Sequence, residues 1–175
     1  LAGMGLPPPA VGPVATGRTG PVYAQILSQT DRERVVEVVT TRGSFRIRLA
    51  CPQAPLTCLS FLQLAGQGFF DGLTFHRVVP DFVVQTGDPR GDGWGGPGFA
   101  LRDEINRQRF GRGAVGMALS GPDTGGSQFF IALSPQPHLD GGYTVFGQVA
   151  GDDSVLDQIR QEDELVTIRE VETGE

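Results

Sequence analysis

Residues 75–85 read FHRVVPDFVVQ, in which one arginine stands inside a run that otherwise has the apolar, β-branched character of a buried strand. Arginine is almost never fully buried without a partner. Arg77 therefore needs a partner or a chemical role, and Gln85 offers an amide within the same stretch. Two interpretations follow: a strand whose arginine reaches out to solvent, or a shallow apolar pocket that carries one fixed cation at its rim.

The composition is that of a single folded domain with a net negative charge. A chain of about 150 residues buries roughly 70% of the surface that it exposes when unfolded, so 175 residues suit one domain. The net charge is −6 and the pI is near 4.9, which argues against a nucleic-acid partner. No run of 18 apolar residues is present, so we expect no membrane span. All 14 basic residues are arginines, which excludes lysine Schiff-base chemistry.

The start of the chain differs from the remainder in composition. It is rich in glycine and proline, with three consecutive prolines at positions 7–9, and such a composition favours extended, solvated backbone. We therefore expect a Pro/Gly-rich linker or tail over residues 1–30, with a short docking segment at 22–27, and a folded domain over residues 31–175. No signal-peptide pattern follows Leu1, so we expect a processed product or a piece of a longer protein. The sequence does not indicate a cellular compartment.

The two cysteines and two histidines form no recognisable site. Cys51 and Cys58 are too few for a disulfide framework, although a bond between them stays open. Cys58 falls in a helical apolar pattern and is expected to pack as a small hydrophobic residue. His76 and His138 match no metal-binding spacing. We therefore expect no metal and no cofactor.

The periodicity of the chain predicts a mainly β fold. Strands are expected at 34–41, 44–49, 73–79, 82–85, 113–119, 127–133, 143–149 and 165–171. Pro55 opens a helix that ends at Gly66 or Gly68, and a second short helix is expected over 152–160. Eight strands with short connections favour a closed antiparallel barrel, because closure leaves no exposed strand edge, and the two helices would cap its ends.

Several motifs point to other chemistry but are incomplete. A single Asp-Thr-Gly at 123–125 lacks the second carboxylate of an aspartic protease. His76, Asp103 and Ser127 follow the chain order of a serine-protease triad, which is defined by geometry and not by order. The glycine-rich segment 91–98 lacks the lysine of a phosphate-binding loop. These alternatives are therefore disfavoured.

Taken together, several stretches resemble the motifs of the cyclophilins, the barrel-type peptidyl-prolyl cis-trans isomerases, in the order of that family. They are FHRVVP-x-F at 75–82, Q-x-GD at 85–88, GMA at 116–118, GSQFF at 126–130, and LDG and VFG between 139 and 147. The resemblance extends from about residue 36 to residue 171. It implies the cyclophilin barrel and an isomerase that assists protein folding on proline-containing peptides and proteins.

The resemblance also implies the roles of individual residues. Arg77 would be the electrostatic catalyst, with Phe82 and Gln85 beside it. The implied substrate-binding residues are Val83, Ala118, Leu119, Ser120, Gln128, Phe130, His138, Leu139 and Tyr143. Within these sets, the proline pocket would be lined by Phe82, Val83, Phe130 and Leu139, and the backbone of Ala118 and Leu119 would pair with the peptide. A second pocket upstream of the proline would be bordered by Asp92, Gly93, Trp94 and Ser120.

Three positions depart from the best-known cyclophilins. His138 stands where many members have tryptophan, Tyr143 where many have histidine, and Val83 where methionine is common. Loss of the indole predicts weak cyclosporin binding with catalysis largely retained. We expect a monomeric domain. Two alternatives remain: a proline-peptide binding module of a larger protein with little turnover, and a structural appendage whose tail carries the biology.

Overall fold

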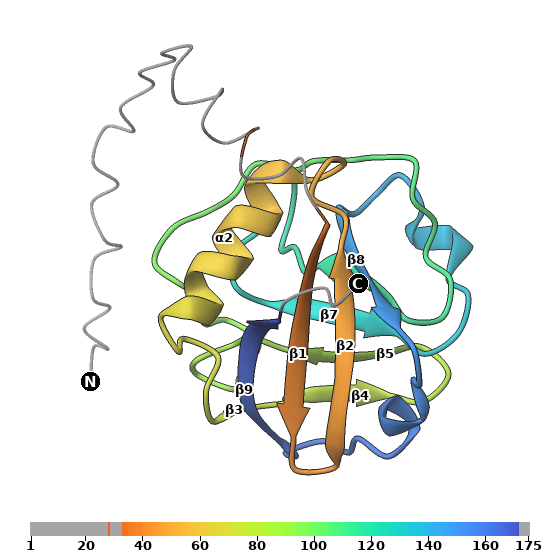
Figure 1. Cartoon of the computed structure of the whole chain (residues 1–175). Coiled ribbons are helices and arrows are strands. Elements are labelled where there is room, and N and C mark those ends of the chain that lie inside the picture. The colour runs from red at the N-terminus through yellow and green to blue at the C-terminus, as the bar shows by residue number, and fades with distance from the viewer. Residues whose placement is uncertain (1–27, 29–32, 172–175) are drawn as a thin grey trace, which may run out of the picture.

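A computed structural model describes Ser28 and residues 33–171. The expected docking segment at 22–27 lies outside the described residues, as does the expected tail over 1–30 apart from Ser28. The described chain forms one antiparallel sheet that curls around a hydrophobic core, with a helix packed beside it (Figure 1). The mainly β fold class is therefore confirmed.

The sheet contains nine strands where eight were expected. In chain order the elements are β1 (Arg34–Thr40), β2 (Gly43–Leu49), α2 (Pro55–Gly66), β3 (Leu73–Thr74), β4 (Arg77–Val79), β5 (Val83–Thr86), β6 (Ala114–Met117), β7 (Phe129–Ala132), a 3₁₀ helix (Pro137–Leu139), β8 (Val145–Ala150), a second 3₁₀ helix (Ser154–Asp157) and β9 (Glu164–Val171). The order of neighbouring strands in the sheet is β3-β9-β1-β2-β8-β6-β7-β5-β4.

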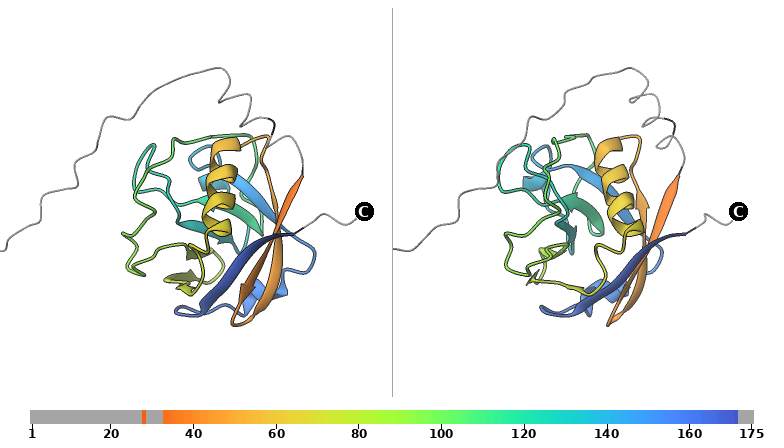
Figure 2. Two further views of the ribbon diagram at one scale, coloured as in Figure 1. Left: turned by 60° about the vertical axis from the view of Figure 1, so that its left-hand side comes forward. Right: turned by 90° about the vertical axis from the view of Figure 1, so that its left-hand side faces the viewer.

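The additional strand arises because the expected strand over 73–79 is divided. Strand β3 pairs with β9, whereas β4 pairs with β5. Between them Phe75 is buried, and its N–H donates to the carbonyl of Asp163 at 2.9 Å. This bond interrupts the strand, so that β3 and β4 pair with different neighbours. Because β3 and β4 are the two end strands, the ladder of the described residues does not close. The predicted closed barrel is corrected to a strongly curled sheet (Figure 2).

Helix α2 has the bounds that the sequence predicts. Proline occupies its first turn, where a missing N–H costs no intrahelical bond. The carboxylate of Glu104 accepts the backbone N–H groups of Leu56 at 3.0 Å and Thr57 at 2.8 Å. A negative charge at this end also complements the helix dipole. The helix buries Phe61 and packs against β9.

The second α-helix expected over 152–160 is wrong, because only the 3₁₀ helix at Ser154–Asp157 forms there. Its backbone bonds join residues three apart, from the N–H of Leu156 to the carbonyl of Asp153 at 3.0 Å. The carboxylate of Asp152 accepts the N–H of Ser154 at 2.9 Å. Such local bonds from an aspartate compete with a regular helix. α2 is therefore the one α-helix within residues 33–171.

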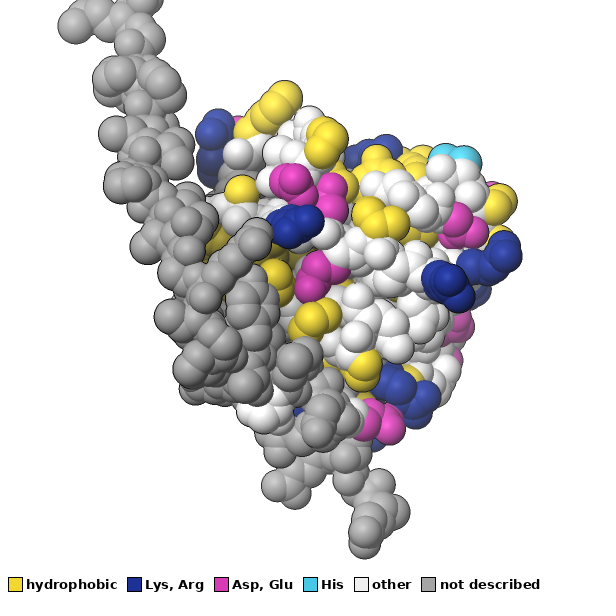
Figure 3. Space-filling model, turned by 90° about the horizontal axis from the view of Figure 1, so that it is seen from above, with side chains coloured by type: hydrophobic (Ala, Val, Ile, Leu, Met, Phe, Trp, Pro, Cys, Tyr) yellow, Lys and Arg dark blue, Asp and Glu magenta, His cyan; other side chains and the backbone are white. Residues whose placement is uncertain are grey.

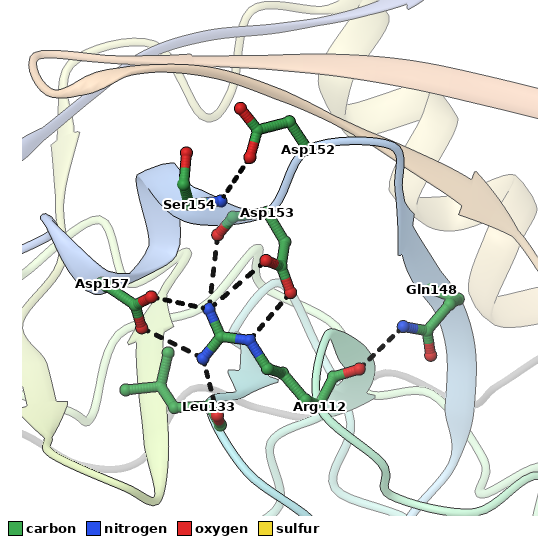
Figure 4. A network of polar contacts seen from close by, with 7 residues as sticks. All are labelled: Arg112, Leu133, Gln148, Asp152, Asp153, Ser154 and Asp157. Atoms are coloured by element: carbon green, nitrogen blue, oxygen red, sulfur yellow. Dashed lines mark hydrogen bonds and ion pairs between the residues drawn. The ribbon is translucent and has the colours of Figure 1, made fainter.

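Arg112 ties this 3₁₀ helix to the loop that precedes β6 (Figure 4). Its guanidinium donates to the carboxylates of Asp153 at 2.8 Å and Asp157 at 2.9 Å, and to the carbonyl of Leu133 at 2.8 Å. The carbonyl of Arg112 in turn accepts the side-chain amide of Gln148 on β8 at 2.9 Å. This network is a structural clamp that joins three segments distant in sequence.

The buried side chains form two clusters. The larger one lies between the sheet and α2 and includes Phe61, Phe129 and Phe146. The smaller one contains Val83, Phe110, Ala114, Phe130, Leu139 and Val145. Both cysteines are free and buried in the larger cluster, and the hydrogen bond with the thiol of Cys51, together with burial, raises the pKa of Cys58. Its expected role as a small core residue is confirmed. Among the described residues, no helix has the length and apolar character needed to cross a membrane.

Candidate active site

The site is built on the pairing of β4 with β5. In this antiparallel pair Arg77 lies directly opposite Gln85, and Gln85 lies opposite Phe130 on the neighbouring β7. Residues opposite one another project from the same face of a sheet. The ladder therefore brings a cation, an amide and an aromatic ring together on one face.

A small hollow lies beside this row of side chains. Its volume is about 110 Å³, and it is lined by Arg77, Phe82, Val83, Gln85, Ala118, Leu119, Phe130, Leu139 and Tyr143. Pockets for drug-sized ligands measure about 300–1,000 Å³. The hollow therefore suits a single side-chain-sized apolar group, such as one ring.

Arg77 lies at the rim of this hollow and is exposed to solvent. Its Nη1 donates to Oε1 of Gln85 at 3.3 Å, and its Cζ lies 5.5 Å from the centroid of the Phe82 ring. The ring face attracts the cation, and the amide restricts the rotation of the guanidinium. Of the two interpretations of residues 75–85, the geometry favours the pocket with one fixed cation at its rim.

The position of the Phe130 ring, which lines the hollow, depends on one glycine. A Cβ at Gly116 would lie 2.5 Å from Cζ of Phe130 and 2.6 Å from Cε1 of Phe110. Because Gly116 has no side chain, these two rings stack over it with centroids 5.4 Å apart. Tyr143 then meets Phe130 edge-on at 5.7 Å. Phe110 is a residue of the site that the sequence did not predict, because it stands alone in a polar, non-periodic loop.

A directed chain of hydrogen bonds continues from Arg77 away from the hollow. The Nε2 group of Gln85 donates to Oε1 of Gln128 at 3.0 Å. The Nε2 group of Gln128 donates to the carbonyls of Gly93 at 3.0 Å and Gly95 at 2.9 Å. Since backbone carbonyls only accept, they orient the first amide, and that amide orients the second. The oxygen of Gln85 is thereby directed at the guanidinium.

The loop that supplies those carbonyls is held by the buried carboxylate of Asp88. It accepts the N–H groups of Arg90 at 2.8 Å and Gly93 at 2.5 Å. A Cβ at Gly95 would lie 1.9 Å from Oδ1 of Asp88, so glycine is required there. Although burial opposes the charged form, the backbone hydrogen bonds to it lower the pKa of Asp88. The sequence included Asp88 in a motif without indicating that it anchors this loop.

A second hollow of about 210 Å³ adjoins the first and shares Gln85, Ala118 and Leu119 with it. Ser120, Gln128 and residues 93–97 are among its lining residues. Trp94 lies at this hollow with 78% of its surface exposed. Its ring is therefore accessible to a ligand in this hollow. Ser120 and Gln128 thus lie beside the second hollow and not in the first.

The backbone between the two hollows is partly free. The N–H of Ala118 donates to the carbonyl of Gln128 at 3.0 Å and is therefore unavailable to a peptide. No bond from the described part of the chain engages the N–H or the carbonyl of Leu119. An extended peptide would pair here by adding a short strand.

His138 is placed outside the first hollow. Its ring stacks on Phe82 with centroids 5.8 Å apart and an interplanar angle of 20°. Phe82 is thus held between the hollow and the imidazole.

The protease-like and metal-binding alternatives find no support in the geometry. The hydroxyl of Ser127 is buried and donates to the carbonyl of Gly87 at 2.7 Å, so it is not a free nucleophile. Within the residues that the structure covers, no group of three histidine, cysteine or acidic side chains is arranged to hold a metal ion.

Comparisons with known proteins agree with this site. The family model described as cyclophilin-type peptidyl-prolyl cis-trans isomerase/CLD matches residues 35–173. A peptidyl-prolyl cis-trans isomerase of Synechococcus elongatus is 46% identical over 132 residues, which cover 74% of this chain and 91% of that protein. A peptidyl-prolyl cis-trans isomerase-like 1 protein of Rhizopus delemar is 48% identical over 126 residues, with 69% and 76% covered.

Solved structures give the same result. A crystal structure of a cyclophilin-type isomerase from Cryptosporidium parvum superposes with a TM-score of 0.78 at 31% identity, covering 82% of this chain and all (100%) of that one. A crystal structure of the same protein in the presence of the dipeptide Ala-Pro gives 0.75 at 31% identity, with 79% and 99% covered. The chain therefore belongs to the family of cyclophilin-type peptidyl-prolyl cis-trans isomerases.

Proposed function

We propose that the chain accelerates rotation about Xaa-Pro bonds in exposed segments of proteins during folding, with Arg77 as the electrostatic catalyst. The observation that carries the proposal is the guanidinium of Arg77 at the rim of a 110 Å³ apolar hollow, hydrogen-bonded to Gln85. The proline ring occupies the hollow, where Phe82, Phe130 and Leu139 surround it. A structure of a related isomerase obtained in the presence of Ala-Pro supports this choice of ligand.

The chemistry requires neither a nucleophile nor a cofactor. Rotation of a prolyl amide faces a barrier of about 20 kcal/mol, because it breaks the resonance of the amide. In the twisted state the imide nitrogen becomes pyramidal and gains a lone pair. A guanidinium directed at that nitrogen stabilises the twisted state more than either planar state, and this difference accelerates the reaction. The apolar hollow excludes water that would otherwise solvate the planar carbonyl.

The hydrogen-bond chain behind Arg77 prepares the cation for this role. A donor that already points at the developing lone pair has no reorganisation to undergo during the reaction. Gln85 and Gln128 transmit the fixed orientation of the loop carbonyls to the guanidinium. Arg77 makes only that one side-chain hydrogen bond within residues 33–171, so its remaining N–H groups stay available to substrate.

The peptide upstream of the proline would lie along Leu119 and enter the second hollow. Trp94 at that hollow is the single tryptophan of the chain and therefore reports on its occupancy. Titration with a longer peptide such as Ala-Ala-Ala-Pro should change the tryptophan emission, whereas Ala-Pro alone should not. An equal response to both peptides would contradict this placement.

A direct assay separates an isomerase from a proline-peptide binding module. A short Ala-Pro peptide is mixed with a catalytic amount of protein, and cis–trans exchange is measured by NMR. We expect exchange cross-peaks whose build-up rate rises with protein concentration. Shifted or broadened peptide resonances without faster exchange would favour the binding module.

We further propose that the domain is monomeric and binds cyclosporin weakly. His138 presents less apolar area than an indole and lies outside the first hollow, stacked on Phe82. Sedimentation and a cyclosporin inhibition constant test the two statements separately.

A further inference from the structure

The imidazole of His138 lies beside the first hollow and packs on one of its lining residues. The residue lies on the 3₁₀ helix Pro137–Leu139 and is exposed. Its ring stacks on Phe82 with centroids 5.8 Å apart. No hydrogen bond from any residue the structure describes engages either imidazole nitrogen. The ring is therefore held in place by an apolar contact while its nitrogens remain available to a ligand.

The charged groups around the imidazole are few. The Cζ atom of Arg77 lies 5.5 Å from the centroid of the Phe82 ring, and Asp81 precedes Phe82 in the chain. On its own turn, Asp140 accepts the N–H of Phe110 at 2.8 Å and lies 3.8 Å from the guanidinium of Arg109. Figure 3 shows that acidic and basic side chains are interspersed on one face of the molecule. Among the described residues, no carboxylate forms an ion pair with His138.

The direction of a bound peptide places its next residue near this imidazole. The segment upstream of the proline lies toward the second hollow, which shares Gln85, Ala118 and Leu119 with the first. Phe82 and Leu139 line the first hollow but not the second, and His138 stacks on Phe82 and directly precedes Leu139 in the chain. The residue that follows the proline therefore leaves the hollow on the His138 side.

We propose that His138 determines specificity by favouring substrates that carry a carboxylate side chain on the residue directly after the proline. This inference rests on the proposed mode of peptide binding. Histidine is the side chain whose charge changes between pH 5 and pH 8. As an imidazolium it donates a charge-assisted hydrogen bond to a carboxylate, and such bonds are stronger than neutral ones. The preference for acidic substrates therefore increases as the pH falls.

The experiment compares two peptides that differ by one charge, Ala-Ala-Pro-Glu and Ala-Ala-Pro-Gln, both blocked at their ends. Exchange NMR gives kcat/KM for each at pH 8.0 and pH 5.8, where the peptide carboxylate stays largely ionised at both values. We expect the Glu/Gln ratio of kcat/KM to rise about threefold at the lower pH, as for a solvent-exposed ion pair. A ratio that does not change with pH would overturn the proposal.

Two variants assign the effect. His138→Phe keeps an aromatic ring on Phe82 but does not titrate, so its Glu/Gln ratio should be independent of pH. Arg109→Gln removes a neighbouring charge that is constant over this range, so it should lower the ratio equally at both pH values. A ratio that still rises in His138→Phe would assign the titration to another group and overturn the proposal. Absence of turnover on either peptide at both pH values would instead refute the proposed function.

Discussion

Phe129 and Phe130 are neighbours on β7, yet they belong to different parts of the molecule. The ring of Phe129 meets Phe61 at 5.3 Å and Phe70 at 5.8 Å, both edge-on, in the closed core beneath α2. The ring of Phe130 stacks on Phe110 and borders the open hollow beside Arg77. Successive residues of a strand point to opposite faces of the sheet. One strand therefore contributes to stability on one face and to the active site on the other.

The largest expected effect is on the closed face. Phe129→Ala should lower the free energy of unfolding by about 3–5 kcal/mol, because it removes a fully buried ring and leaves a cavity. Urea denaturation measures this change. The matched variant Phe130→Ala should lose less stability but most of its activity, because its ring borders a hollow that is already open. Equal loss of stability in the two variants would contradict the division of β7 into two faces.

The next effect is on the open face. Arg77→Ala should lower kcat/KM by about 10²-fold, which corresponds to about 3 kcal/mol of transition-state stabilisation. Exposure of Arg77 predicts little change in the unfolding midpoint. Arg77→Lys keeps the charge but not the planar fork of donors. Its kcat/KM should therefore lie between the values of the unmodified protein and of Arg77→Ala. Near-normal turnover in Arg77→Ala would exclude the electrostatic role.

The hydrogen-bond chain gives a smaller effect that refines the open face. Gln128→Leu should lower kcat/KM about tenfold, because the amide that orients Gln85 is lost and interacting residues typically couple by about 0.5–3 kcal/mol. In the Arg77→Ala background the same change should have little further effect. Fully additive losses would mean that Gln128 acts only by contacting the peptide.

Addition of apolar area at the rim should strengthen drug binding. His138→Trp should tighten cyclosporin about tenfold, since roughly 50 Å² of additional apolar surface contributes about 1 kcal/mol. Inhibition constants for the two proteins measure the change. If the unmodified chain already binds as tightly as tryptophan-bearing cyclophilins, the proposed reason for weak binding is wrong.

The smallest effect concerns the loop anchor and depends on pH. Because the folded-state pKa of Asp88 is depressed, its contribution to stability is fully present above the unfolded value of about 3.9 and is lost as the pH falls through the folded value. The difference in unfolding free energy between the unmodified protein and Asp88→Asn should therefore shrink between about pH 4 and pH 2. A difference that stays constant to pH 2 would contradict a charged Asp88 in the folded state.

Much of the site was predictable because its residues are close in sequence. Residues 75–85 contain both Arg77 and Gln85, and two short strands with a tight connection place them opposite each other. The alternation along β7 likewise predicts which of its side chains face outward. Phe110 and the anchoring role of Asp88 were not predictable, because both act through partners on other segments and lie in loops without periodicity.

Local patterns alone determined the mainly β class, the bounds of α2 and the residues that meet on one sheet face, since strand and helix periods are properties of neighbouring residues. Tertiary structure alone decided that the strand over 73–79 divides, that Arg112 holds the 3₁₀ helix Ser154–Asp157, and that Gln128 orients Gln85. Each of these outcomes depends on hydrogen bonds between segments far apart in the chain. The curled sheet is what brings the partners of these bonds within reach of one another.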